Sequence, residues 1–101
     1  NVGMKTVNVI SDVTEGRKCN PSSAYRYYSR ANVYVQRKDY ESAISDYTKA
    51  LEIDSNLPEA YYNRGMAFIH SGKKTEGIAD LSKAGELGLY TAYSVLKKYN
   101  K

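Results

Sequence analysis

The chain holds few residues from which catalysis could be built. Nucleophilic chemistry would have to use Cys19, the only cysteine, with His70, the only histidine, as its base. An activated thiol needs a base within hydrogen-bond reach, and these two residues are far apart in the sequence. One cysteine and one histidine do not make a metal site. The sequence also lacks a glycine-rich phosphate loop and a nucleophile elbow, so nothing in it predicts a cofactor.

The pairs of acidic residues have a structural explanation. Asp39 with Glu41, and Glu52 with Asp54, fall at the ends of predicted helices. Carboxylates at such places cap free amide groups or interact with the helix dipole. We therefore predict that the protein is not an enzyme and binds no metal or cofactor.

Composition and charge indicate an ordinary solvated surface. The 101 residues are 26% charged and 42% hydrophobic, which is typical of one globular domain or a fragment of a larger protein. The net charge of +4 owes much to the two chain ends, at Arg17, Lys18, Lys97, Lys98 and Lys101, and charges of both signs alternate between them. This distribution disfavours nucleic acid as a partner. No stretch is suited to span a bilayer or to act as a signal peptide, so no membrane partner is expected. A single cysteine excludes an internal disulfide and favours a cytoplasmic setting, with an exported or periplasmic fragment left open.

One sequence pattern occurs twice between Tyr27 and Leu87. We call the displacement that places Tyr27 on Tyr61 the repeat shift, and a self-match at a fixed period of this size is typical of a repeat array. The recurring arginines, Arg30 and Arg64, we interpret as structural, with their aliphatic stems packed along neighbouring helices. The identical pairs are Tyr27 with Tyr61, Tyr28 with Tyr62, Arg30 with Arg64, Ile44 with Ile78, Asp46 with Asp80, Lys49 with Lys83, Ala50 with Ala84 and Glu52 with Glu86.

Each copy predicts two helices. Its apolar and small residues recur at steps of three and four, which is the spacing of one helical face. Ala31 and Gly65 would allow the first helix of a repeat to approach the second, because a larger side chain would separate the helix axes. By the same argument, Ala43 and Gly77 would allow the second helix to approach the next repeat.

These residues carry a family resemblance. The order Tyr27, Ala31, Tyr34, Ala43, Tyr47, Ala50, repeated as Tyr61, Gly65, Phe68, Gly77, Leu81, Ala84, resembles the tetratricopeptide repeat (TPR). The resemblance implies an all-α fold, a right-handed superhelix of antiparallel helical hairpins with two repeats and a C-terminal capping helix. The sequence departs from the pattern at Ser55 and Leu89, which replace a proline, and at Lys38, where Gly72 is the more usual turn residue.

The predicted boundaries follow from caps and turns. Residues 1–21 form a non-repeat leader, either flexible or an arm that packs against a helix or a neighbouring molecule. Ser22 or Ser23 would cap a helix that begins near Ala24. Pro58 suits a first helical turn. The TPR domain spans 22–101, with repeat one at about 24–57, repeat two at about 58–90 and the capping helix at about 90–100. The expected helices are 24–36, 39–53, 58–70, 74–87 and 90–99.

The resemblance also implies a concave groove that binds an extended peptide or a segment of a partner protein. The residues that line this groove come from the first helix of each repeat and from the last helix. We predict that this set lines it: Tyr25, Tyr28, Ser29, Asn32, Gln36, Glu59, Tyr62, Asn63, Met66, His70 and Lys98. Tyrosine suits such a groove because it offers a large amphipathic surface at low entropic cost.

Asn32 and Asn63 stand where family members that clamp a terminal carboxylate place asparagines. The clamp is incomplete here, because Tyr28 takes the place of a lysine and only Lys97 or Lys98 could supply charge. Without cations a carboxylate lacks the charge-assisted bonds that make such a site strong. We therefore expect both asparagines to bond to the backbone of an extended ligand.

Three alternatives stay open. Tyr28 and Tyr62 could shield the inner helices without any ligand. The leader or an open edge could pair with a second copy, which would make the chain a self-association element or homo-oligomer. Surface tyrosines with scattered Lys and Arg could bind single-stranded RNA, in which case binding would weaken steeply with salt.

Overall fold

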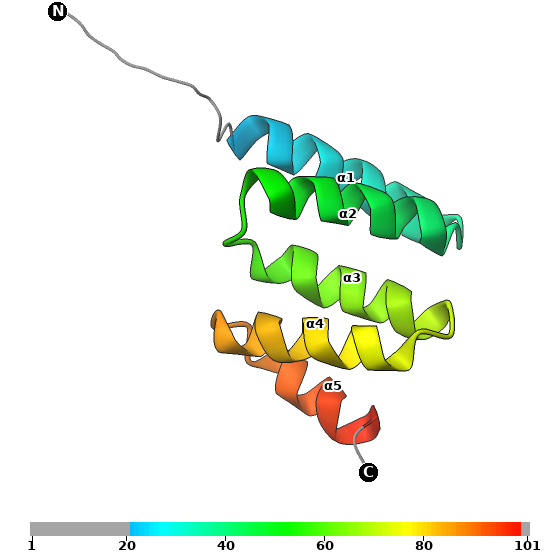
Figure 1. Ribbon diagram of the computed structural model, residues 1–101, viewed down its shortest axis with the longest axis vertical. Helices are drawn as coiled ribbons and strands as arrows, with labels where there is room; N and C mark the ends of the chain where they lie inside the picture. Colours follow the sequence, from blue (N-terminus) through cyan, green and yellow to red (C-terminus); the bar gives the residue numbers. More distant parts are fainter. Residues whose placement is uncertain (1–20, 100–101) are drawn as a thin grey trace, which may run out of the picture.

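The computed structural model describes residues 21–99, which form five helices and no strand. Figure 1 shows the helices stacked one after another, each antiparallel to the one before it. This arrangement confirms the all-α prediction and four of the five expected helix starts to within a residue. The helices are α1 (Pro21–Gln36), α2 (Tyr40–Ile53), α3 (Pro58–His70), α4 (Lys74–Glu86) and α5 (Thr91–Tyr99).

The start of α1 differs from the prediction. The helix begins at Pro21, before Ala24, so Ser22 and Ser23 lie inside its first turn and do not precede it as caps. A proline fits the first helical position because its φ angle is already helical and its missing N–H would have no intrahelical acceptor. The predicted leader, apart from Pro21, lies outside the described residues.

The two hairpin turns share one backbone geometry. Gly72 has a φ of 91°, and Lys38, its counterpart in the first repeat, has a φ of 63°. In both turns the next amide bonds back to the preceding helix, from Asp39 N to Tyr34 O at 2.9 Å and from Lys73 N to Phe68 O at 2.7 Å. The Asp39 side chain then caps α2 by accepting from Ser42 N at 3.3 Å.

Small residues set the close contact between the helices of one repeat. A Cβ atom on Gly65 would lie 2.9 Å from the carbonyl oxygen of Gly77, and one on Gly77 would lie 2.5 Å from Cγ1 of Ile69. Gly77 therefore faces the first helix of its own repeat, and the prediction that it faces the next repeat was wrong. Ala31 and Ala43 are fully buried in one cluster with Tyr47 in the first repeat.

The last helix covers the second repeat, as predicted for a cap. Ala92 of α5 is fully buried against Leu81 and Ala84 of α4. A Cβ atom on Gly85 would lie 2.6 Å from the ring of Tyr93, so the glycine allows that ring to lie on α4. None of the described helices is long and apolar enough to cross a membrane.

Candidate functional site

Four polar side chains join the first helices of the two repeats. Asn63 Nδ2 on α3 donates to Tyr28 OH at 3.1 Å and to Asn32 Oδ1 at 3.2 Å, both on α1. The same Asn32 oxygen accepts a hydrogen bond from Tyr47 OH on α2. The structure thus brings together three predicted groove residues, Tyr28, Asn32 and Asn63, and anchors them on a buried tyrosine. We call these four residues the Asn–Tyr network.

Tyr47 is the fully buried member of this network. Its side chain is fully buried, and burial, followed by the neighbouring Tyr28, raises the pKa of its hydroxyl above the ordinary value of 10.0. The hydroxyl therefore stays protonated and able to donate to Asn32. The Nδ2 group of Asn32 has no hydrogen-bond partner among the residues that the structure describes, so it keeps two N–H groups for a ligand.

A small hollow adjoins the network. It is lined by Tyr25, Tyr28, Leu57, Glu59 and Ala60. The rings of Tyr25 and Tyr28 meet edge to face at 5.5 Å, and Tyr25 is 60% exposed. Three predicted groove residues, Tyr25, Tyr28 and Glu59, therefore share one surface at the start of α1 and α3.

Two further predicted residues lie deeper in the repeat. Tyr62 and Met66 are half-buried and pack against the cluster of Leu81, Ala84 and Ala92 that joins α4 to α5. Their partial exposure leaves contact area for a ligand, but part of each side chain serves the core. That Tyr28 and Tyr62 only shield the inner helices, without a ligand, stays an alternative prediction.

The remaining predicted residues are not drawn into the network. Ser29, Gln36 and Lys98 are exposed. His70, at the end of α3, stacks on Tyr40 of α2 with ring centroids 5.3 Å apart and planes at 22°. This contact joins the two repeats at the opposite end of α3 from Glu59.

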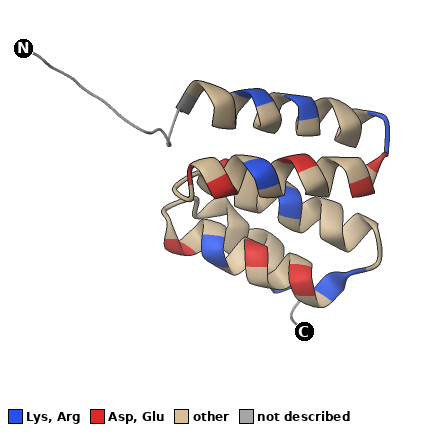
Figure 2. Ribbon diagram, turned by 45° about the horizontal axis from the view of Figure 1, so that its top comes forward, with Lys and Arg blue, Asp and Glu red and all other residues tan. Residues whose placement is uncertain are grey.

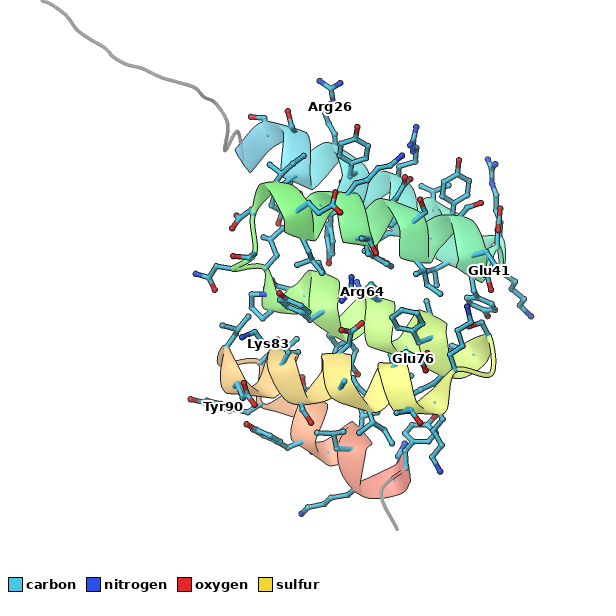
Figure 3. All side chains as sticks on the ribbon, viewed as in Figure 1. Arg26, Glu41, Arg64, Glu76, Lys83 and Tyr90 are labelled. Atoms are coloured by element: carbon cyan, nitrogen blue, oxygen red, sulfur yellow. The ribbon has the colours of Figure 1, made fainter. Side chains whose placement is uncertain are left out.

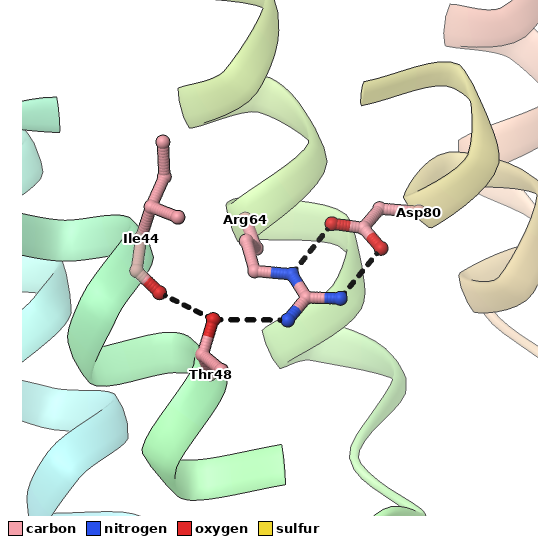
Figure 4. A network of polar contacts seen from close by, with 4 residues as sticks. All are labelled: Ile44, Thr48, Arg64 and Asp80. Carbon is pink, nitrogen blue, oxygen red and sulfur yellow. Dashed lines mark hydrogen bonds and ion pairs between the residues drawn. The ribbon is translucent and has the colours of Figure 1, made fainter. Parts of the chain in front are cut away.

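The sequence interpretation missed the partners of the recurring arginines. Arg64 Nε and Nη2 donate to the two carboxylate oxygens of Asp80 at 2.7 and 2.8 Å. Its Nη1 donates to Thr48 Oγ1 at 3.1 Å, and that hydroxyl donates to the carbonyl oxygen of Ile44 at 2.8 Å (Figure 4). Arg64 thus ties α2, α3 and α4 together. The hydrogen bond and charge of Asp80 raise the pKa of the Arg64 guanidinium.

The first repeat has the same ion pair, with Arg30 Nε 2.6 Å from Asp46 Oδ2. Each arginine therefore forms an ion pair with a carboxylate on the second helix of its repeat, and the packing of the aliphatic stems stays a prediction. The signal was present in the sequence, because both Arg30 and Asp46 recur at the repeat shift. Among the described residues, no group of acidic, histidine or cysteine side chains could hold a metal ion.

Comparison with known proteins agrees with this architecture. The sequence profile of the TPR repeat matches residues 31–72, and that of the tetratricopeptide repeat matches residues 58–87. The first TPR of Spaghetti (RPAP3), bound to the HSP90 peptide SRMEEVD, is 26% identical, with a TM-score of 0.76 over 83% of this chain and 68% of its own. The second TPR domain of the human RPAP3 protein, in complex with the HSP70 peptide SGPTIEEVD, is 31% identical, with a TM-score of 0.73 over 78% of this chain and 68% of its own. The comparison with curated proteins gave no match.

The chain belongs to the tetratricopeptide repeat family. The predicted fold, a right-handed superhelix of helical hairpins with a C-terminal capping helix, is confirmed. Both of the similar TPR domains are described with a bound peptide.

Proposed function

We propose that this chain is a non-enzymatic module that binds an extended peptide segment of a partner protein along α1 and α3. The observation that carries the proposal is the Asn–Tyr network, which fixes Asn32 and Asn63 on adjacent first helices. Two amides held at a set spacing suit the regular N–H and C=O groups of an extended backbone. Because the network forms without a ligand, little side-chain entropy is lost on binding.

The hollow beside the network supplies the apolar part of the contact. Tyr25 and Tyr28 offer ring surface, and Leu57 and Ala60 form its apolar wall. Each backbone hydrogen bond contributes about 0.5–1.5 kcal/mol, and each partly buried ring adds apolar area. We infer an affinity near micromolar, about −8 kcal/mol.

We propose further that the groove does not depend on a terminal carboxylate. Of its eleven predicted members only Lys98 is a lysine or arginine, and Glu59 places a negative charge in the hollow. A ligand carboxylate would therefore gain little from charge-assisted bonds. In this respect we expect the chain to bind an internal segment as well as a chain end.

The test is a calorimetric titration of the whole chain with SGPTIEEVD and with the same peptide carrying a C-terminal amide. We propose that Asn32 and Asn63 bond to the backbone of the peptide and not to its terminal carboxylate. Both forms should therefore bind with dissociation constants within about twofold. Asn63→Ala should weaken both by about 3- to 10-fold, the equivalent of one hydrogen bond, and exposed Thr75→Ala on α4 should leave them unchanged.

Two results would contradict the proposal. Loss of binding by the amidated peptide alone would show that a carboxylate clamp operates. Equal affinities for Asn63→Ala and the parent chain, with helicity preserved in circular dichroism, would remove the network from binding. Self-association and a cytoplasmic setting stay predictions, and light scattering over a range of concentrations tests the first.

A further inference from the structure

The first repeat carries an open polar cleft of about 410 Å³ between α1 and α2. Four of its lining residues come from α1 and recur at steps of three and four, which places them on one face of that helix. The fifth comes from α2. We call it the basic cleft, and it is lined by Ser23, Arg26, Tyr27, Arg30 and Lys49. Figure 3 shows Arg26 pointing away from the stack of helices.

The basic cleft and the proposed peptide groove use different faces of α1. The groove residues Tyr25, Tyr28 and Asn32 each follow a cleft residue, at 23, 26 or 30, by two positions. Two positions turn an α-helix by about 200°. A ligand in the basic cleft therefore does not compete with a peptide at the Asn–Tyr network.

The basic cleft has an excess of positive charge. Figure 2 shows Lys and Arg but no Asp or Glu on α1. Asp46 balances the charge of Arg30, because the two form a bidentate ion pair. Glu52, one turn after Lys49 on α2, does not line the cleft. Arg26 and Lys49 have no ion-pair partner among residues 21–99, so their two charges stay uncompensated.

The ring of Tyr27 draws cations from two helices to one place. Arg30 Cζ on α1 lies 5.8 Å from the ring centroid, and Lys49 Nζ on α2 lies 5.7 Å from it. The face of an aromatic ring attracts cations, which offsets part of the repulsion between the two side chains. The donors of the cleft are therefore grouped before any ligand arrives.

The second repeat shows which kind of atom Arg30 could still bind. Arg64, its counterpart at the repeat shift, donates from Nη1 to Thr48 Oγ1 at 3.1 Å. Arg30 uses Nε and Nη2 for Asp46, and its Nη1 has no partner among residues 21–99. The Arg30 side chain is 56% exposed, against 18% for Arg64. An oxygen atom that accepts from Arg30 Nη1 would therefore complete the arrangement present at Arg64.

The lining of the basic cleft does not suit an apolar partner. At the repeat shift Ser23 falls on Leu57, and Arg26 falls on Ala60. Leu57 and Ala60 pack in one core cluster with Leu51 of α2. A serine and an arginine at these places offer less apolar area and more hydrogen-bond donors, so a polar ligand with acceptor oxygens fits better.

We propose that the basic cleft binds a phosphate group, with Arg26, Arg30 and Lys49 as its donors. A phosphate monoester carries about −1.5 to −2 charges at pH 7 and three acceptor oxygens, which match the two uncompensated cations and the separate donors. A carboxylate has one charge and two oxygens and would leave part of the charge unbalanced. Because Arg26 and Lys49 are exposed, each contact adds little, and we expect a dissociation constant of about 1 mM for inorganic phosphate.

The experiment is an NMR titration of the isotope-labelled full chain with sodium phosphate at about pH 7.5, where the dianion predominates. Sodium chloride is adjusted to keep the ionic strength constant. The side-chain signals of Arg26, Arg30 and Lys49 should shift saturably with one dissociation constant. The Arg64 signal is the internal control and should stay in place, because all three of its nitrogens already have partners. The side-chain amides of the Asn–Tyr network should also stay in place.

Two variants with the same change of charge test whether the cleft is the site. Lys49→Gln removes a cation of the cleft, and Lys83→Gln removes its exposed counterpart at the repeat shift. The first should weaken phosphate binding about threefold or more. The second should leave it unchanged within about 1.5-fold, because salt screens a distant exposed charge. Arg26→Gln should act like Lys49→Gln, and circular dichroism shows whether the helices of each variant are preserved.

A phosphopeptide separates the two sources of a phosphate group. Tighter binding of the acetylated and amidated tripeptide glycine–phosphoserine–glycine than of inorganic phosphate would assign the cleft to a phosphorylated protein segment, and equal or weaker binding would assign it to the free ion. Three results would overturn the proposal: equal binding of the same tripeptide with glutamate in place of phosphoserine, equal effects of Lys49→Gln and Lys83→Gln, or shifts that sodium chloride alone reproduces.

Discussion

Arg64 and Asp80 form a bidentate ion pair across the α3–α4 hairpin, with Nε 2.7 Å from Oδ2 and Nη2 2.8 Å from Oδ1. Arg30 and Asp46 repeat the pair in the α1–α2 hairpin. The two pairs differ in surroundings, because the Arg64 side chain is mostly buried and that of Arg30 is mostly exposed. This difference predicts unequal effects of the same substitution.

Asp80→Asn should destabilise the fold more than Asp46→Asn. The first change leaves the Arg64 charge in a buried place without its counter-ion, which costs about 2–4 kcal/mol. After the second change water can reach the exposed Arg30, so we expect a smaller loss of stability. Urea unfolding followed by circular dichroism measures both. Equal losses would show that exposure of the arginine does not govern the pair.

Lys38→Gly should stabilise the chain. Lys38 has a φ of 63° in the turn where the second repeat has Gly72, and this left-handed conformation costs an L-residue about 1 kcal/mol. The midpoint of thermal unfolding should rise accordingly, and Gly72→Ala should lower it by a similar amount. An unchanged or lower midpoint for Lys38→Gly would mean that the lysine is not strained.

Gly77→Ala should destabilise by about 1–3 kcal/mol. The new Cβ atom would lie 2.6 Å from the carbonyl oxygen of Gly65, so α3 and α4 would have to separate. Thr75→Ala, on an exposed position of the same helix, is the matched control and should be neutral or slightly stabilising. Denaturant unfolding of the two variants measures the difference. If Gly77→Ala is as stable as the control, the close contact of these helices is not required.

Stability should fall above about pH 10 because of Tyr47. Burial raises the pKa of its hydroxyl above the ordinary 10.0, so the folded chain keeps this proton at a pH where the unfolded chain loses it. The stabilisation is complete below pH 10 and decreases by up to about 1.4 kcal/mol per pH unit above it. Tyr47→Phe should be less stable at neutral pH, but its free energy of unfolding should lack this decrease above pH 10. Parallel pH profiles of the two chains in urea unfolding would contradict the assignment.

The repeat pattern predicted most of the fold because each helix has its partner nearby in the sequence. The positions of α2, α3 and α4 follow from apolar periodicity, Pro58 and the two turns. The start of α1 was not predicted correctly, because Ser22 and Ser23 suggested a cap, whereas the helix already begins at Pro21. The direction that Gly77 faces was also missed, since spacing places a residue on a helix face but does not say which neighbour meets that face.

The candidate site was predicted less completely. Asn32, Asn63 and Tyr28 do meet, but the bonds between them depend on the angle between α1 and α3 and on the depth of Tyr47. Neither the angle nor the depth can be predicted from the sequence of a single helix. His70 illustrates the same limit, because its stacking on Tyr40 arises only when the two repeats are packed together.

The central claim is that a peptide binds along α1 and α3 at the Asn–Tyr network. The most direct measurement is a two-dimensional NMR titration of the isotope-labelled full chain with amidated SGPTIEEVD, following the side-chain amides of Asn32 and Asn63. We predict that these two signals and the backbone of Tyr25 shift together with one dissociation constant near micromolar, while exposed Thr75 and Ala79 of α4 stay in place. Saturable shifts confined to α2 and α4, with both asparagine side chains unmoved, would contradict the account.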